Sequence, residues 1–298
     1  MTRRSDPLLK VKWEADKLLQ ELGIDVLPVD PFEIADRLGI ALQAMPSRMG
    51  GASGMLIHVA GQFGICYPTH VGSDGFKNFS VGHEIGHYRL PGHIDAVLDD
   101  NGRHVSAAGF HSSNRYELEA DHFAAALLMP GRLVGPILKK AGDGLAGVEA
   151  IASECETSLE AAAIRYAHLC PDPVAVIRSQ GAAIDYAFMS NSLRDFDGLD
   201  WIRKDSPLPP ESGTHEFNLA DANVLRGARR SGGSNLQDWF GGPHRQRITE
   251  QTVGLGTYGK TLTILTGMQP PDELEDDDDE NDEEDEGLIE SWTPRFRR

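Results

Sequence analysis

The sequence predicts an α+β protein: a helical domain with a small β-sheet, then two helices of helix-turn-helix proportions, then a mixed or mainly β domain. Three observations support this prediction. Apolar residues recur at three- and four-residue spacings through much of 8–169, which is the period of an amphipathic helix. Short runs rich in β-branched and aromatic residues lie in 174–190 and 252–266. Residues 272–286 are almost all acidic and cannot bury apolar surface, so we expect a disordered acidic tail over 271–298.

The N-terminal part should contain two helices and a β-hairpin. Residues 8–22 place apolar side chains on one helical face, and a glycine follows them. A second helix over 30–38 is predicted by its Asp-Pro start, because aspartate caps the first turn and proline suits its first position. Two short β-rich segments around an Ala-Gly-Gln turn predict a hairpin over 55–67.

The central part should be helical around one long loop. Helices are predicted over 79–90 and 114–130, each ended by a proline. We expect 93–113, which is rich in glycine, histidine and serine, to be a loop. Two further helices over 145–155 and 159–169 have helix-turn-helix proportions.

A DNA-binding role for this helix pair is weakly supported. Only Arg165 and His168 supply basic groups on the second helix, and several glutamates lie close to them. A recognition helix needs basic side chains to approach phosphates. A structural or substrate-docking role for the pair is therefore favoured, and direct nucleic-acid binding is not.

A change of composition near Pro171–Pro173 marks a domain boundary. The predicted domains are 1–140, 141–171 for the helix pair, 172–270 for the mixed or β domain, and 271–298 for the tail. Between the β-rich runs lies a basic zone, formed by Arg226, Arg229, Arg230, Arg245 and Arg247 with Trp239 and Phe240 close by. Two interpretations of this zone stay open: a solvated loop that balances the acidic tail, or a docking surface for an acidic partner, a nucleic acid or the tail itself.

Charge and composition limit the class of protein. The chain has 298 residues, 46 of them acidic and 28 basic, and a net charge of −18. Residues 272–298 carry −11 of this charge, so the other 271 residues carry only −7. This balance argues against nonspecific nucleic-acid binding by the whole chain. Three scattered cysteines and no long apolar stretch predict a soluble, cytoplasmic protein with no membrane partner.

The segment His83-Glu84-Ile85-Gly86-His87 has the pattern H-E-x-x-H. On a helix, residues four apart share a face, so both imidazoles can bind one ion while Glu84 faces a water bound to that ion. The apolar residues around this segment predict a buried helix, and buried histidines and glutamate without partners would each cost about 1–3 kcal/mol. A metal ion would account for them.

A catalytic zinc ion generally has three protein ligands and one open position. Glu117 and Asp121 lie four residues apart on the next predicted helix, so Glu117 can supply the third ligand while Asp121 accepts a hydrogen bond from a ligand histidine. Glu119 is the fallback ligand. His93, just past the helix end, is expected to be solvated rather than a ligand.

The chain resembles the ImmA/IrrE family of zinc metallopeptidases. The resemblance rests on FSVGHEIGHYRLPGH at 79–93 and RYELEADHFAAALLMP at 115–130, with further likeness at 29–40 and 158–169. It covers roughly residues 10–170. Gly82 stands where the family more often has alanine, which should loosen the helix slightly.

The resemblance implies a zincin-like metallopeptidase domain over 1–140 that binds one Zn²⁺ through His83, His87 and Glu117, with Glu84 as the catalytic base. It also implies a cytoplasmic endopeptidase that cuts a helix-turn-helix repressor in a stress response or on a mobile element. The alternative is a non-proteolytic zinc-binding regulator, or a DNA-binding protein that acts through partner interaction. The group that stabilises the oxyanion is left open among Tyr88, Tyr116, His104 and His111.

Overall fold

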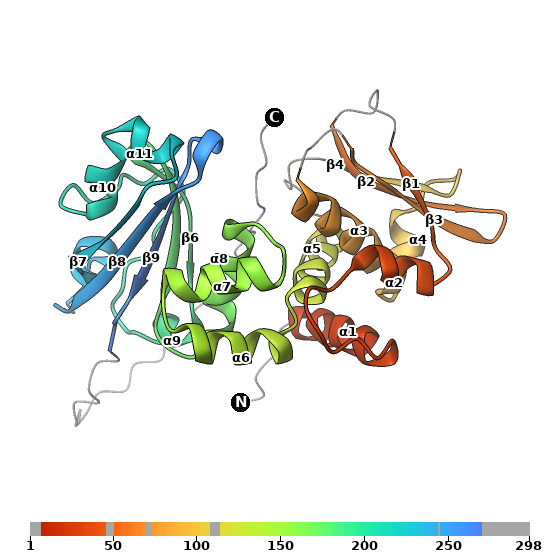
Figure 1. Cartoon of the computed structure of the whole chain (residues 1–298), viewed down its shortest axis with the longest axis horizontal. Helices are drawn as coiled ribbons and strands as arrows, with labels where there is room; N and C mark the ends of the chain where they lie inside the picture. The colour runs from red at the N-terminus through yellow and green to blue at the C-terminus, as the bar shows by residue number, and fades with distance from the viewer. Residues whose placement is uncertain (1–6, 46–50, 70–72, 108–113, 244, 270–298) are drawn as a thin grey trace, which may run out of the picture. The chain divides into compact units, whose positions relative to one another are not determined.

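The computed structural model describes residues 7–45, 51–69, 73–107, 114–243 and 245–269. This part of the chain is α+β, as predicted, with two β-sheets and twelve α-helices (Figure 1). It divides into two compact units, one made of residues up to 137 together with 151–158, the other of 138–150 and residues from 159 onward. The predicted domain limits stay predictions. The predicted acidic tail and His111 lie outside the described residues.

The first unit contains a four-stranded sheet in the order β1-β3-β2-β4. Its strands are β1 (Ala41–Ala44), β2 (Ala52–Val59), β3 (Gln62–Tyr67) and β4 (Arg103–Ala107). Its helices are α1 (Pro7–Glu21), α2 (Pro31–Arg37), α3 (Asp74–Arg89), α4 (His93–Val97) and α5 (Arg115–Leu128). Strands β2 and β3 form the predicted antiparallel hairpin.

The predicted helix starts are explained by their caps. Asp30 accepts hydrogen bonds from the backbone N–H groups of Phe32 and Glu33, so α2 begins where its aspartate indicates. Helix α3 begins five residues earlier than the apolar pattern indicated, because Ser73 caps it through the N–H of Phe76.

One hydrophobic core holds the first unit together. It joins α1, α2, α3 and α5 with β2 and β3, and its fully buried side chains include Leu19, Ile34, Leu56, Ile85 and Phe123. Helix α5 packs against both α1 and α3. Burying such side chains contributes about 1.5–3 kcal/mol each, so this core fixes the positions of α3 and α5.

The prediction of a loop over 93–113 is wrong for residues 93–97 and 103–107. The short helix α4 begins at His93, and β4 pairs antiparallel with β2 through Arg103–Ala107. Strand β4 contains few apolar residues, so its strand character depends on backbone pairing with β2 rather than on its own pattern. Among the described residues it is one of the two edge strands of this sheet, the other being β1.

The second unit contains a five-stranded antiparallel sheet in the order β6-β5-β9-β8-β7. Its strands are β5 (Ala175–Gln180), β6 (Ala183–Met189), β7 (Arg229–Asn235), β8 (Arg247–Gly254) and β9 (Thr261–Thr266). Helices α6 (Gly131–Ala141) and α7 (Leu145–Glu154) each have residues in both units. The other helices of the second unit are α8 (Leu159–Leu169), α9 (Asn191–Arg194), α10 (Gly213–Asn218), α11 (Asp221–Leu225) and α12 (Leu236–Phe240), with a 3₁₀ turn over Gly256–Tyr258. The β-rich runs of the sequence correspond to β5, β6, β8 and β9.

A buried ion network ties α8 to the sheet of the second unit. Arg178 on β5 donates hydrogen bonds to Glu160 on α8, at 2.5 Å, and to Asp185 on β6, at 3.1 Å. Tyr186 also donates to Glu160, at 2.8 Å. The Arg178 side chain is only 3% exposed, so these carboxylates balance a charge that water cannot reach.

The basic side chains singled out in the sequence are largely engaged. Arg165 on α8 is buried, which removes it from any DNA-reading surface. Arg229 and Arg230 pair with Glu149 and Glu216. Trp239 and Phe240 lie in the hydrophobic core of the second unit and are not part of a basic surface.

No helix of the described residues is both long and apolar enough to cross a membrane.

Candidate metal centre

Helices α3 and α5 lie unusually close together because two glycines of α3 face α5. A Cβ atom on Gly86 would lie 3.2 Å from the backbone Cα of Ala120, and a Cβ atom on Gly82 would lie 3.4 Å from Ala124 Cβ. The first spacing is tighter than ordinary contact, and the second is ordinary. The close approach brings the polar residues of α5 up to His83 and His87.

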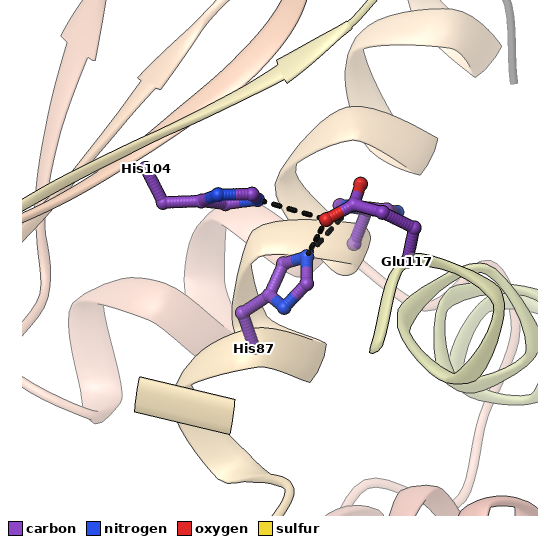
Figure 2. A group of neighbouring side chains, drawn as sticks. His87, His104 and Glu117 are labelled. Carbon is purple, nitrogen blue, oxygen red and sulfur yellow. Dashed lines mark hydrogen bonds and ion pairs between the residues drawn. The ribbon is translucent and has the colours of Figure 1, made fainter. Parts of the chain in front are cut away.

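Four side chains point their donor atoms at one small region. His83 Nε2 lies 3.0 Å from His87 Nε2, and the Glu117 carboxylate lies 3.3 Å from each of them. His104 Nε2, from β4, lies 3.1 Å from Glu117 Oε1. The four donor atoms all lie within 4.8 Å of one another. Figure 2 shows His87 and His104 directed at the Glu117 carboxylate.

This arrangement fits a zinc ion. Zinc takes imidazole nitrogens and carboxylate oxygens at about 2.0–2.2 Å, so tetrahedral ligand atoms lie about 3.3 Å apart, close to the spacings here. Glu117 Oε1 and Glu84 Oε2 are buried, and neither makes a hydrogen bond of regular geometry within the described residues. A cation held between Glu117 and the converging imidazoles would account for the Glu117 oxygen.

The charges of the site also favour a cation. Burial lowers the pKa of His87 to about 3, so this imidazole is neutral. Burial acts the same way on His83, but hydrogen bonds to Asp121 and Glu117 outweigh it and raise its pKa to about 10. Burial raises the pKa of Glu117, yet contacts with the three histidines reverse this and hold it well below its usual range. The carboxylates thus attract positive charge, which a proton on His83 supplies when no ion does.

His83 and Asp121 form the contact expected for an oriented ligand. His83 Nδ1 lies 2.8 Å from Asp121 Oδ1, and both side chains are almost fully buried. With Nδ1–H donated to Asp121, Nε2 is left to face His87 and Glu117.

Glu84 is held beside the site by two residues of the neighbouring strands. Ser106 on β4 donates a hydrogen bond of 2.6 Å to Glu84 Oε1. Gly54 on β2 pairs with Ser106 across the sheet, and a Cβ atom there would lie 2.3 Å from Glu84 Oε1. Burial raises the pKa of Glu84, although His83 and the Ser106 hydrogen bond oppose the shift. This shift moves the pKa of the Glu84 carboxyl toward the value that suits a general base near neutral pH.

Of the candidates for an oxyanion-stabilising group that the structure describes, His104 lies beside His83, His87 and Glu117. The Tyr88 ring packs on Phe63, with centroids 5.0 Å apart, and the Tyr116 ring packs edge-on against His93. His104 and Ser106 alternate on β4, and an alternating His-x-Ser pattern was the signal that could have placed both on one strand face.

His93 and Glu119 do not lie where the sequence analysis expected. His93 is fully buried rather than solvated, with Nδ1 3.1 Å from His87 Nδ1. Its Nε2 lies 3.0 Å from Glu119 Oε2, and burial lowers its pKa. Glu119 thus contacts His93 rather than joining the group that converges on Glu117. Nothing in the local sequence pattern indicated either contact.

Comparison with known proteins gives a family match and likenesses of fold. The Peptidase M78 family, described as the IrrE N-terminal-like domain, matches residues 35–166. A solved structure titled Mycobacterium tuberculosis transcriptional regulator is similar with a TM-score of 0.55 at 15% sequence identity, over 86% of this chain and 76% of that chain. An identity this low establishes a likeness of fold alone. No curated protein matches the sequence.

Proposed function

We propose that the protein is a zinc-dependent endopeptidase, because residues 35–166 match the IrrE N-terminal-like domain family and contain the candidate metal centre. The observation that carries the proposal is the convergence of His83, His87 and Glu117 from two helices, with Glu84 held beside them. We assign the first three as zinc ligands, Glu84 as the catalytic base and Asp121 as the residue that orients His83.

When bound, zinc polarises a peptide carbonyl and lowers the pKa of a water molecule. The two carboxylate oxygens of Glu84 then have different roles, one in holding the side chain in place and one in accepting a proton. Oε1 is held by Ser106, whereas Oε2 is buried without a hydrogen bond among the described residues, and we assign Oε2 to accept the proton of the attacking water. The same carboxyl returns this proton to the leaving amine.

We assign His104 to stabilise the oxyanion by donating a hydrogen bond from its ring. Its Nε2 lies next to the donor atoms but comes from a different element, the edge strand β4. Three protein ligands leave a position for water and substrate, and a histidine beside that position can donate to the developing negative charge. Removal of one such donor typically costs about 10²–10³ in kcat.

The proposed substrate is a helix-turn-helix transcriptional repressor, as the ImmA/IrrE resemblance implies, cut to relieve repression in a stress response or on a mobile element. The mildly acidic body of the chain supports this choice, because a basic DNA-binding substrate would be attracted to it.

Two measurements on full-length protein test the proposal. Elemental analysis should find one zinc per chain, and a protein purified without stoichiometric metal would contradict the ligand assignment. Co-expression with a helix-turn-helix protein encoded beside this chain should give cleavage products, and Glu84→Gln should retain the metal but abolish them. If Glu84→Gln still cuts, the base is another residue. If wild type binds the repressor and leaves it intact, the protein is a non-proteolytic regulator.

A further inference from the structure

A line of hydrogen-bonded side chains runs outward from His87, away from the converging donor atoms. His87 Nδ1 lies 3.1 Å from His93 Nδ1, and His93 Nε2 lies 3.0 Å from Glu119 Oε2. The other oxygen of Glu119 accepts a hydrogen bond of 2.6 Å from Arg115 Nε. Three elements contribute to this line: His87 lies in the last turn of α3, His93 begins α4, and Glu119 and Arg115 lie on α5.

We propose that His93 and Glu119 form an outer relay that sets the tautomer and ring orientation of His87 for metal binding. This inference rests on the proposed zinc site, and it makes His93 a positioning residue rather than a ligand. The relay would do for His87 what the direct contact with Asp121 does for His83.

The hydrogen positions follow from the two distances. His87 Nε2 is the atom that faces His83 and Glu117, so it must be free of hydrogen to bind a metal, and His87 Nδ1 then carries the hydrogen. Its neighbour His93 Nδ1 must accept that hydrogen. His93 Nε2 therefore carries its own hydrogen and donates it to Glu119. Each ring nitrogen in the line has one role, and only one tautomer of each histidine satisfies both contacts.

The surroundings of His93 hold it in this role. The side chain is fully buried, and the Tyr116 ring meets it edge-on at 5.0 Å with an interplanar angle of 87°. Gly92 adopts a left-handed conformation, φ 79°, that lets the chain turn sharply between α3 and α4. A buried imidazole with both nitrogens engaged has no freedom to rotate away from His87.

The relay also accounts for three acidic residues at alternate positions of α5. Glu117 lies among the converging donor atoms, and Asp121, one turn later, contacts His83. Glu119 lies between them in sequence and on a different side of the helix, where it meets His93. The outer nitrogen, Nδ1, of each imidazole of the H-E-x-x-H segment is thereby connected to a carboxylate of α5, directly for His83 and through His93 for His87.

The test compares His93→Phe with His93→Gln in zinc-loaded full-length protein. Phenylalanine keeps the ring but can neither accept from His87 nor donate to Glu119. A glutamine amide can do both, because its oxygen accepts and its nitrogen donates. Zinc affinity is measured by competition with a chromophoric chelator, and the His87 tautomer by long-range ¹H–¹⁵N correlation of the imidazoles. His58→Phe serves as the matched control, because His58 stacks on Phe63 and takes no part in the relay.

We expect His93→Phe to weaken zinc binding by about 10–100-fold, the usual loss on removing an outer partner of a ligand. We also expect its His87 Nδ1–H signal to lose its protection from exchange. His93→Gln should stay within a few-fold of wild type and keep the signal, as should His58→Phe. If His93→Phe does not fold, Glu119→Gln is the second variant to test. We expect it to shift the His93 Nε2–H signal and to weaken zinc binding.

The relay is refuted if wild type binds stoichiometric zinc and folded His93→Phe, or Glu119→Gln in its place, binds it equally well with an unchanged His87 tautomer. It is also refuted if His93→Gln loses as much affinity as His93→Phe, because the loss would then reflect packing alone. Wild type without stoichiometric zinc would overturn the proposed function itself, and the relay with it. The wild-type metal content therefore separates the two failures.

Discussion

Replacing Gly54 by alanine should displace the proposed base without touching a proposed ligand. The added methyl carbon would lie 2.3 Å from Glu84 Oε1 and 3.1 Å from two further carbons of the same side chain. An ordinary contact needs more than 3 Å, so the carboxylate must move by about 1 Å. Glu84 is fully buried, and such a shift also breaks its hydrogen bond with Ser106, which contributes about 1 kcal/mol.

A misplacement of this size typically lowers a catalysed rate about 10²-fold. Gly54→Ala should therefore cut the proposed substrate about a hundredfold more slowly while it binds zinc as wild type does, because Glu84 is not one of the proposed ligands. The assay is the initial rate of product formation on gels, together with metal content of the same sample. Gly64→Ala is the control, since the Cβ atom there meets its nearest neighbour at 3.5 Å in the same sheet. A Gly54→Ala protein that cuts at the wild-type rate, or that loses its zinc, would refute the placement of Glu84.

Three further predictions concern the metal, the helix contact and the second unit. Removal of the metal by a chelator should lower Tm by several degrees, because an ion at a hundredfold excess over its Kd stabilises the folded protein by about 2.7 kcal/mol. Added zinc should restore the Tm. A Tm that chelators leave unchanged would argue against a structured metal site. Gly86→Ala should destabilise the protein by about 1–3 kcal/mol in urea denaturation and weaken zinc binding, because the added methyl group pushes against the α5 backbone. Gly82→Ala should be neutral or stabilise the protein by up to about 1 kcal/mol in the same assay. Equal losses in both variants would contradict this reading of the contact. Arg178→Met should destabilise by about 3–5 kcal/mol in the same assay, because it leaves Glu160 without its cation, although Asp185 keeps its ion pair with Lys260; exposed Arg203→Met should change stability little.

The two helices of the metal centre were predictable because the information for each is local. The H-E-x-x-H segment and the Glu117-to-Asp121 spacing place side chains on one helical face through the 3.6-residue period alone. The capping residue Asp30 and the hairpin turn at 60–62 are equally local signals, and the structure confirms both.

The parts that were missed depend on pairing between segments far apart in the chain. The roles of Gly54 and Ser106 follow from the register of β2 with β4, and no pattern within either strand specifies that register. Strand β7 is rich in arginine, glycine and serine, mostly exposed, and held by its backbone bonds to β8, so it has no apolar alternation to detect. His93 was expected in solvent because its partner His87 is reached only after the turn at Gly92.

The open edge of β4 bears on the kind of substrate that can be cut. The strand pairs with β2 on one side only, among the described residues, and it carries His104 and Ser106 beside the metal centre. A polypeptide can extend such a sheet only when its own backbone N–H and C=O groups are unpaired, which those of a folded helix are not. A folded protein substrate bound along β4 would therefore first have to expose an extended segment. Its susceptibility would then follow its local opening equilibrium, and a ligand that holds it folded would protect it.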